Sequence, residues 1–552
     1  METLITDFSI AEPGDRIIDS DPTTFGPIAP QRPGSWRLID FEAEHFSGKF
    51  LQASDREAAT LTVPLGCDGW HAVSIGMCGS GVKQGPASIE VRLTGDEHWQ
   101  FLRADGSTGR EIELVEEPWL MADLTGRALE VRFPQQPGPV LARLFSVRAV
   151  SMTDAHVARL QQDPARPLMM IIDGNLSGRE EPGPHMMDGI FEPFRDSPWS
   201  ACCYGVGGAD LVNYDTKVGT IVGEGSWDME EGYGGSFEVV TEMIRLGLDP
   251  MQLAVDTAHR SGHPLLAYIR NQLWICEPPL DQKFRSKFYS EHPEYCCVEA
   301  DGVVDASKLS IAFPEVRRQL NGIMRECLER GADGVSLCFA RGFPLVRYEQ
   351  PVLDRYRERH GGDARELADT DERLRGVWSE LVTEWIREIR ELLDSFGPSA
   401  MYERRKLAVI GGPNQEWHLG FGIDYGEWGR ERLVDIVAPY PRGIELEADG
   451  MIEGVAEIAT GLQGTEVELA PSLGSYADHR MTVREVRARA DAFYRAGASG
   501  LSRWDTSFWL ARLQMESAEV QRLWVEHYMP PTGAIVSTAG LNRQRFNPRI
   551  GV

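Results

Sequence analysis

From Pro167 onward, short apolar runs alternate with amphipathic helical segments. PLMMIID (167–173) and PLLAYIRN (264–271) are continuous apolar runs of strand length, and segments with a helical apolar face lie between such runs. Continuous apolar strands are typical of parallel sheets whose faces are covered by helices. Because parallel strands need a crossover of helix length, this alternation restricts the region to the α/β class.

An internal repeat indicates how many strands the region holds. RGADGVSL (330–337) and AGASGLSR (496–503) share a helix end, a turn and a strand start. We expect strands near residues 170, 213, 267, 337, 409, 437, 468 and 502, so that the two copies fall on the fourth and the eighth. Eight strands with intervening helices predict a (β/α)8 TIM barrel.

The chain before this region follows another pattern. Between Trp36 and Met152, six short strand-like runs are separated by turn residues and show almost no helical periodicity. This pattern predicts an antiparallel β-sandwich, jelly-roll-like, that precedes the barrel. The predicted organisation is an extended N-terminal arm (1–35), a β-sandwich accessory domain (36–152), a helical linker (153–166) and a barrel domain with a C-terminal extension (167–552).

Composition limits the partners. The 552 residues include 84 acidic and 56 basic side chains, a formal net charge of −28 at pH 7. A field of this sign repels phosphate backbones and anionic lipids, so we expect no nucleic acid or membrane partner. The sequence shows no signal peptide and no apolar run of membrane-spanning length, which predicts a cytoplasmic protein with reduced cysteines. We expect the β-sandwich to be structural or to form a homo-oligomer, rather than to bind glycans.

Five segments of the predicted barrel are similar to those of a known family. They are YIRNQ (268–272), KFYSEHPEY (287–295), FPEVRRQLNGIMRECLERGADGVSL (313–337), RYEQPVLDRYRERHGGDARELADTDERL (347–374) and GFGIDYGEWGRERLVDIVAPYP (420–441). On these segments the chain resembles the family 10-like glycosyl hydrolases, which are barrel proteins. The resemblance implies a carbohydrate-active barrel, often with a β-sandwich attached. The chain departs from the family pattern at Ser336 and Cys338, where relatives have acidic residues, and at Gln272, where Asp is common.

Hydrolysis of a glycosidic bond requires two carboxyl groups, and barrel enzymes hold them at the carboxyl ends of strands. The catalytic candidates are Glu468, Glu349, Asp173 and Asp505. We expect Glu468, in the seventh strand, to be the nucleophile or general base, and Glu349, in the loop after the fourth, to donate the proton. Asp173 ends the first strand and Asp505 follows the eighth, where they would bind sugar hydroxyls or tune pKa values. The structural alternatives are an Asp-Gly turn at Asp173 and a salt bridge at Glu468.

A second group of residues is expected to bind the substrate. It consists of Arg270, Asn271, Arg341, Tyr348, Trp504, Asp215 and Glu416. The two arginines and Asn271 end the third and fourth strands and could hold sugar hydroxyls or a substrate carboxylate. Trp504 could stack on a sugar ring. The alternative for the arginines is that they pair with the acidic residues and tie the rim of the barrel together.

The sequence predicts no metal and no cofactor. His418, Asp478 and His479 could approach one another above the barrel, but no HxH or HExxH spacing is present. The leading hypothesis is a glycoside hydrolase that cleaves a small or medium-sized glycan or glycoside by a two-carboxylate mechanism. The alternatives are a carbohydrate-binding barrel without catalysis, which the missing acids of strand four would explain, and a metal-dependent sugar isomerase or lyase.

Overall fold

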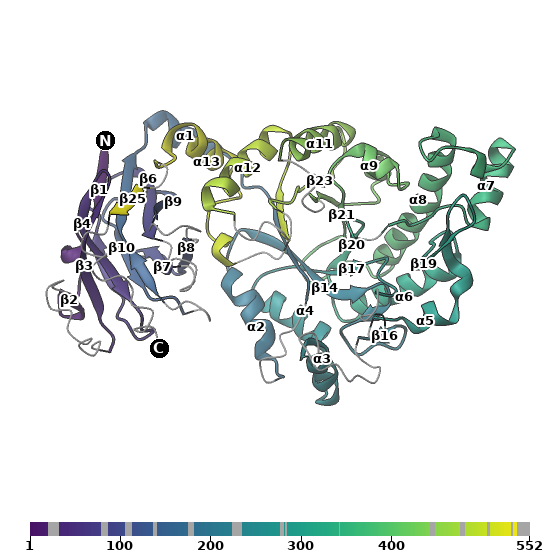
Figure 1. Ribbon diagram of the computed structural model, residues 1–552, viewed down its shortest axis with the longest axis horizontal. Coiled ribbons are helices and arrows are strands. Elements are labelled where there is room, and N and C mark those ends of the chain that lie inside the picture. Colours follow the sequence, from purple (N-terminus) through teal and green to yellow (C-terminus); the bar gives the residue numbers. More distant parts are fainter. Residues whose placement is uncertain are drawn as a thin grey trace. The chain divides into compact units, whose positions relative to one another are not determined.

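A computed structural model shows a mixed α/β protein with several sheets (Figure 1). It describes residues 1–19, 33–78, 87–104, 113–135, 141–174, 182–222, 235–276, 281, 284–341, 343–441, 448–474, 481–504, 508–531 and 534–537. The chain divides into two compact units. Unit 1 comprises Met1–Ala165, Arg480–Asp491 and Ser507–Val552, and unit 2 comprises Arg166–His479 and Ala492–Thr506. No helix of the described residues is long and apolar enough to cross a membrane.

Unit 1 contains two sheets. The larger has the order β1 (Glu2–Ile5), β12 (Ser146–Ser151), β6 (Trp70–Cys78), β9 (Glu113–Asp123), β25 (Ala534–Ser537), β3 (Trp36–Ala43), β4 (Ser47–Ala53) and β11 (Ala142–Leu144), with β2 (Ile17–Asp19) beside β3. The smaller has the order β5 (Leu61–Pro64), β10 (Ala128–Arg132), β7 (Ala87–Leu93) and β8 (Gln100–Ala104). Among the strands described here, every pair except β2–β3 is antiparallel. Helix α1 (Asp154–Gln162) follows β12.

The C-terminal part of the chain belongs to unit 1, whereas the sequence analysis assigned it to the barrel domain. Strand β25 pairs with both β3 and β9, and it thereby joins these two strands in the larger sheet. Helix α13 (Ala518–Leu523) and the π-helix η10 (Trp524–Tyr528) supply apolar side chains to a cluster that includes Ala72 and Met121. At the other end, residues 2–5 of the predicted arm form β1, which pairs with β12.

Unit 2 contains eight parallel strands. They are β13 (Leu168–Ile172), β14 (Trp199–Gly208), β17 (Leu265–Arg270), β20 (Gly334–Cys338), β21 (Lys406–Gly411), β22 (Ile436–Pro439), β23 (Glu468–Leu469) and β24 (Leu501–Trp504). Each pairs with the next along this series up to β23, and β24 pairs with β13. A parallel bridge joins Ser472, just after β23, to Ser502 of β24. The series of strands therefore returns to its start.

The second parallel strand lies upstream of its predicted position. The run at 211–215 contributes β15 (Leu211–Val212), which is antiparallel to β14 and precedes β16 (Thr220–Ile221). The parallel strand is WSACCYGVGG, β14, whose small residues did not give a strand signal. Packing requires a glycine at position 205, because a Cβ there would lie 2.2 Å from the carbonyl oxygen of Asp173.

Helices alternate with the parallel strands along the chain. Their bounds are α2 (His185–Phe191), α3 (Gly235–Arg245), α4 (Pro250–Arg260), α5 (Lys287–Glu291), α6 (Pro314–Glu329), α7 (Gln350–His360), α8 (Glu372–Ser395), α9 (Gln415–Leu419), α10 (Tyr425–Arg430), α11 (Ala448–Gly461) and α12 (Val483–Arg495). A hairpin of β18 (Cys296–Val298) and β19 (Val304–Leu309) precedes α6. The predicted apolar stripes of α6 and α8 are buried, and the predicted capping box joins Thr482 and Glu485.

Alternate strand residues form a core between the eight strands. Their side chains include Met169, Ile171, Cys203, Leu266, Tyr268, Cys338, Ile410, Ile436, Ala438, Tyr440 and Trp504, all nearly inaccessible to solvent. In each strand, the residues that follow the last core side chain lie at the carboxyl end. The residues that precede the first core side chain lie at the amino end. The two ends of the strand series thus have separate sets of polar side chains.

A histidine–aspartate pair stabilises the amino ends. His259 Nε2 lies 2.7 Å from Asp333 Oδ2, which also accepts a hydrogen bond from the backbone N–H of Leu265 at 2.8 Å. The hydrogen bond to Asp333 raises the pKa of His259. Burial alone would raise the pKa of Asp333, but the hydrogen bonds from His259 and Leu265 outweigh it and lower that pKa.

We therefore expect a pH-dependent contribution of His259 to stability. A histidine whose pKa is raised by folding stabilises fully below its usual pKa of about 6.5 and loses this effect as the pH rises through the folded value. The thermal midpoint of His259→Gln should lie below that of the wild type by about 2 °C at about pH 6, and the difference should shrink by about pH 9. Differential scanning calorimetry checks this, with the exposed His45→Gln as control. An equal difference at both pH values would contradict it.

Candidate functional site

The carboxyl ends of the strands bring Asp173, Arg270 and Trp504 together. Asp173 directly follows β13, Arg270 is the last residue of β17, and Trp504 is the last residue of β24. Arg270 Nη2 lies 2.5 Å from Asp173 Oδ2, and Trp504 Nε1 donates to Asp173 Oδ1 at 3.1 Å. Both oxygens of this carboxylate are thus fixed by donors from two other strands.

The backbone after β13 is held tightly against β14. Gly174 has φ +68°, and a Cβ on it would lie 2.0 Å from the carbonyl oxygen of Gly205. Asn213 Nδ2 donates to the carbonyl oxygens of Gly174 at 3.2 Å and of Gly205 at 2.9 Å. Only glycines permit this approach of the two backbones, and the approach fixes the position of Asp173.

A buried aromatic floor lies below these residues. The ring centroid of Trp504 is 5.5 Å from that of Tyr268 and 4.8 Å from that of Tyr440. The guanidinium carbons of Arg341 and Arg270 lie 5.2 Å and 5.9 Å from the centroid of Trp504, within the range of cation–π contacts. Trp504 is only 1% exposed, so it supports the polar groups and does not present the open stacking surface that the sequence analysis expected.

Glu349 has a structural environment. It is 2% exposed and is the N-cap residue of α7. Its carboxylate accepts hydrogen bonds from the backbone N–H groups of Val298 at 3.0 Å and Arg347 at 2.9 Å, and from Ser310 Oγ at 2.9 Å. Burial raises the pKa of Glu349, against these hydrogen bonds, which lower it. Because backbone N–H groups and the Ser310 hydroxyl bond to both oxygens of the carboxylate, this geometry favours a structural role over the predicted role of proton donor.

Glu468 lies at the opposite end of the strands from Asp173. It is the first residue of β23 and pairs in register with Ile436, the first residue of β22. Its Oε1 lies 3.9 Å from Lys406 Nζ. Burial raises the pKa of Glu468, as does the nearby Asp435, whereas Lys406 lowers it. The predicted role of nucleophile required a place at the carboxyl ends of the strands, which Glu468 does not have.

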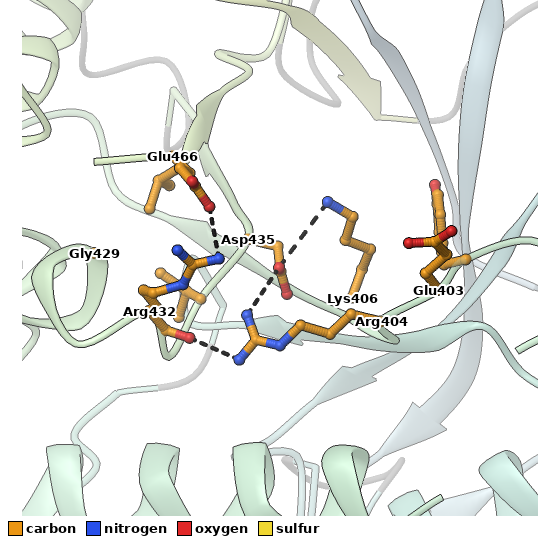
Figure 2. A pocket seen from close by; sticks show the side chains of 10 residues that line it. Glu403, Arg404, Lys406, Gly429, Arg432, Asp435 and Glu466 are labelled. Atoms are coloured by element: carbon orange, nitrogen blue, oxygen red, sulfur yellow. Dashed lines mark hydrogen bonds and ion pairs between the residues drawn. The ribbon is translucent and has the colours of Figure 1, made fainter. Parts of the chain in front are cut away.

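The amino ends hold a charged cavity of about 320 Å³ beside Glu468 (Figure 2). Arg432 lies 2.8 Å from Glu466, and Asp435 is approached by Arg404 at 3.6 Å and by Lys406 at 4.0 Å. Each of these cations has an acidic partner. The arrangement is that of an ion-pair network that ties the starts of β21, β22 and β23 together.

The remaining predicted residues lie apart from one another. Tyr348 is buried and donates to Asp369 at 2.5 Å, and Glu416 is exposed and pairs with Arg375 at 2.8 Å. The backbone oxygen of Asp215 accepts from Arg330 at the end of α6. Asn271 is fully buried after β17, and among the described residues its side chain has no hydrogen-bond partner. Asp505, Asp478 and His479 lie outside the described residues.

Within the described part of the chain, no group of three His, Cys, Asp or Glu side chains could hold a metal ion. Ser336 and Cys338, where the sequence analysis noted a departure from the pattern of the resembled family, are fully buried on β20. Two contributors to the site escaped the sequence analysis, Tyr268 and Tyr440. Tyr268 lies within the predicted strand 264–271 and Tyr440 ends the predicted strand 433–440, each on the same face as its core residues, so period-two alternation could have found them.

Comparisons with known proteins give remote likenesses in structure alone. No protein-family description and no curated protein matches the chain. A Paenibacillus cycloisomaltooligosaccharide glucanotransferase is 9% identical, with a TM-score of 0.33 and coverage of 77% of this chain and half (50%) of that one. A Thermus thermophilus α-galactosidase is 11% identical, with a TM-score of 0.34 and coverage of 90% of this chain and 94% of that one. Morphinone reductase, an enzyme of another class, is 14% identical, with a TM-score of 0.34 and coverage of 62% of this chain and 82% of that one. At these values the likenesses do not identify an activity.

The environment of Glu349 gives a testable prediction. Glu349→Ala leaves three donors without an acceptor, and each buried orphan costs about 1–3 kcal/mol. We expect the thermal midpoint to fall by about 5 °C or more. Glu416→Gln, which breaks only an exposed ion pair, should change it by about 1 °C or less. A Glu349→Ala protein as stable as the wild type would show that these hydrogen bonds do not stabilise the fold.

Proposed function

We propose that unit 2 is a (β/α)8 barrel and that the two sheets of unit 1 form a β-sandwich. The six consecutive parallel pairings from β13 to β23, the pairing of β24 with β13 and the bridge between Ser472 and Ser502 support the barrel. The antiparallel order of the unit 1 strands supports the sandwich. The β-sandwich is proposed as a structural or oligomer-forming domain. For the whole chain, a cytoplasmic location is retained as a proposal.

We propose further that the protein is a glycoside hydrolase whose reaction takes place at the carboxyl ends of the barrel strands. The observation that carries this proposal is the carboxylate of Asp173, held by Arg270 and Trp504 above a buried aromatic floor. Since both of its oxygens accept hydrogen bonds, Asp173 is suited to act as nucleophile or base rather than as proton donor. Arg341, which lies exposed at the same end, would bind sugar hydroxyls or a carboxylate.

A two-carboxylate mechanism needs a proton donor beside Asp173. Asp505 is the first residue after Trp504 in the sequence, and we propose it as the second carboxyl group. The proposal thus replaces Glu468 and Glu349 as the reacting pair by Asp173 and Asp505. Glu349 and Glu468 are left with structural roles.

A second candidate function is carbohydrate binding without hydrolysis. It is favoured by the close ion pair of Asp173 with Arg270, because an aspartate held in this way can also serve only to orient the arginine. In that case the barrel would bind a glycan through Arg270 and Arg341. The two candidates differ in whether bound glycan is cleaved.

The test compares Asp173→Asn with the wild type on a panel of 4-nitrophenyl α- and β-glycosides. We expect the wild type to cleave at least one of them and Asp173→Asn to lower kcat/KM by about 10²-fold or more, as for the loss of an acid–base or nucleophilic group. Glu468→Gln is the matched control, since it removes a carboxylate of unit 2 at the amino ends, and it should stay within about threefold of the wild type.

Three outcomes separate the alternatives. Full activity of Asp173→Asn would place the reaction elsewhere. A loss of activity in Glu468→Gln, with an unchanged thermal midpoint, would restore the role that the sequence analysis gave to this residue. Glycan binding by the wild type without cleavage of any member of the panel would support the second candidate function.

A further inference from the structure

Tyr268 contacts both side chains that hold the carboxylate of Asp173. Its hydroxyl accepts a hydrogen bond from Arg270 Nε at 3.3 Å, and Arg270 in turn reaches Asp173 Oδ2 through Nη2 at 2.5 Å. Its ring lies edge-to-face against that of Trp504, with the centroids 5.5 Å apart and the planes at 86°. Trp504 donates to the other oxygen of the carboxylate, Asp173 Oδ1. One tyrosine therefore lies behind both donors.

Strand geometry explains this arrangement. Side chains two positions apart along a strand point to the same side, so Tyr268 and Arg270 are neighbours on one face of β17. Tyr268 is 1% exposed and belongs to the core between the strands. Arg270 lies nearer the carboxyl end, and its side chain is 22% exposed. The tyrosine is thus the last core side chain of β17, directly beneath the arginine of the site.

The hydroxyl of Tyr268 has a polar role in an otherwise apolar core. A phenylalanine would fill nearly the same space, and a buried hydroxyl costs about 1–3 kcal/mol unless it is hydrogen-bonded. Burial raises the pKa of Tyr268 well above its usual value, so the hydroxyl stays neutral and offers a lone pair to Arg270. Burial also raises the pKa of the Cys338 thiol, and the Tyr268 hydroxyl beside it opposes that rise.

The contact at Nε limits the motion of Arg270. An arginine side chain has about 2 kcal/mol of rotamer entropy, so one bond at Nη2 alone leaves its guanidinium plane free to tilt. Bonds at both Nε and Nη2 fix that plane. The edge-to-face contact fixes the indole of Trp504 in the same way. The carboxylate of Asp173 is then held in one orientation, which is the condition for efficient reaction with a bound substrate.

We propose that Tyr268 is a positioning residue of the Asp173 site, which orients the carboxylate through Arg270 and Trp504 without touching the substrate. The inference rests on the proposed reaction at Asp173 and adds to it a residue that acts from the core. The hydroxyl acts on Arg270 and the ring acts on Trp504, so the two parts of the side chain can be tested separately.

The experiment measures kcat and KM of Tyr268→Phe and Tyr268→Leu on the glycoside that the wild type cleaves best. Tyr268→Phe keeps the ring and should lower kcat about tenfold with KM within about twofold, because a misoriented carboxylate affects the transition state more than binding. Tyr268→Leu also removes the ring and should lower kcat about 10²-fold. The matched control is Tyr204→Phe, which should stay within about twofold of the wild type. Tyr204 is a fully buried tyrosine of β14 whose hydroxyl contacts Met187.

A double-mutant cycle with Asp173→Asn separates positioning from general damage to the fold. If Tyr268 acts through the carboxylate, Tyr268→Phe lowers kcat by less than about twofold once Asp173 is already replaced. An equal loss of kcat in both backgrounds would overturn the proposal. Wild-type kinetics of Tyr268→Phe would overturn it as well.

Failure of the proposed reaction gives a different pattern. If the wild type cleaves no glycoside, the hydrolase proposal fails, and the thermal midpoints of the same four proteins decide the role of Tyr268. The midpoint shifts of Tyr268→Phe and Asp173→Asn should then not add in the double variant, because both substitutions disrupt one chain of contacts. Additive shifts would show that the tyrosine does not act on the carboxylate and would overturn the positioning role.

Discussion

The pairing of β24 with β13 is the contact on which the site depends. These strands are the last and the first of the parallel series, and their register places Trp504 opposite Ile171. Two residues beyond Ile171, Asp173 comes within hydrogen-bond distance of the indole N–H of Trp504. Closure of the strand series therefore assembles a carboxylate and its donor from positions more than three hundred residues apart.

The two ends of the strands use charged residues differently. At the amino ends, Lys406, Arg432 and Asp333 are each satisfied by side chains of neighbouring segments, and these pairs hold the strand starts in place. At the carboxyl ends, Arg270 and the indole N–H of Trp504 bond to Asp173. The exposed Arg341 lies over the ring of the same tryptophan. For the proposed barrel, this division matches the general design of one stable end and one end that binds ligands.

Glycines decide the geometry at two places in unit 2. Gly205 lets the backbone of Asp173 approach β14, and Gly411 leaves space for the polar atoms of Tyr425 and His418. In both cases the absence of a side chain positions a polar group of another segment. The first place shapes the proposed reaction site, and the second accommodates two buried side chains from the segment after β21.

The sequence predicted the α/β class, helices α3, α6, α8 and α12 and seven of the eight parallel strands, because apolar periodicity reports which face of an element is buried. It did not reveal β14, whose small residues are set by the approach of a neighbouring backbone. It named Asp173, Arg270 and Trp504 from their places at strand ends. It did not show that Glu468 lies at the amino ends of the strands, or that the carboxylate of Glu349 accepts hydrogen bonds from backbone N–H groups. Strand register and hydrogen-bond partners join residues distant in sequence, so the surroundings of these acids could be seen only in the tertiary structure.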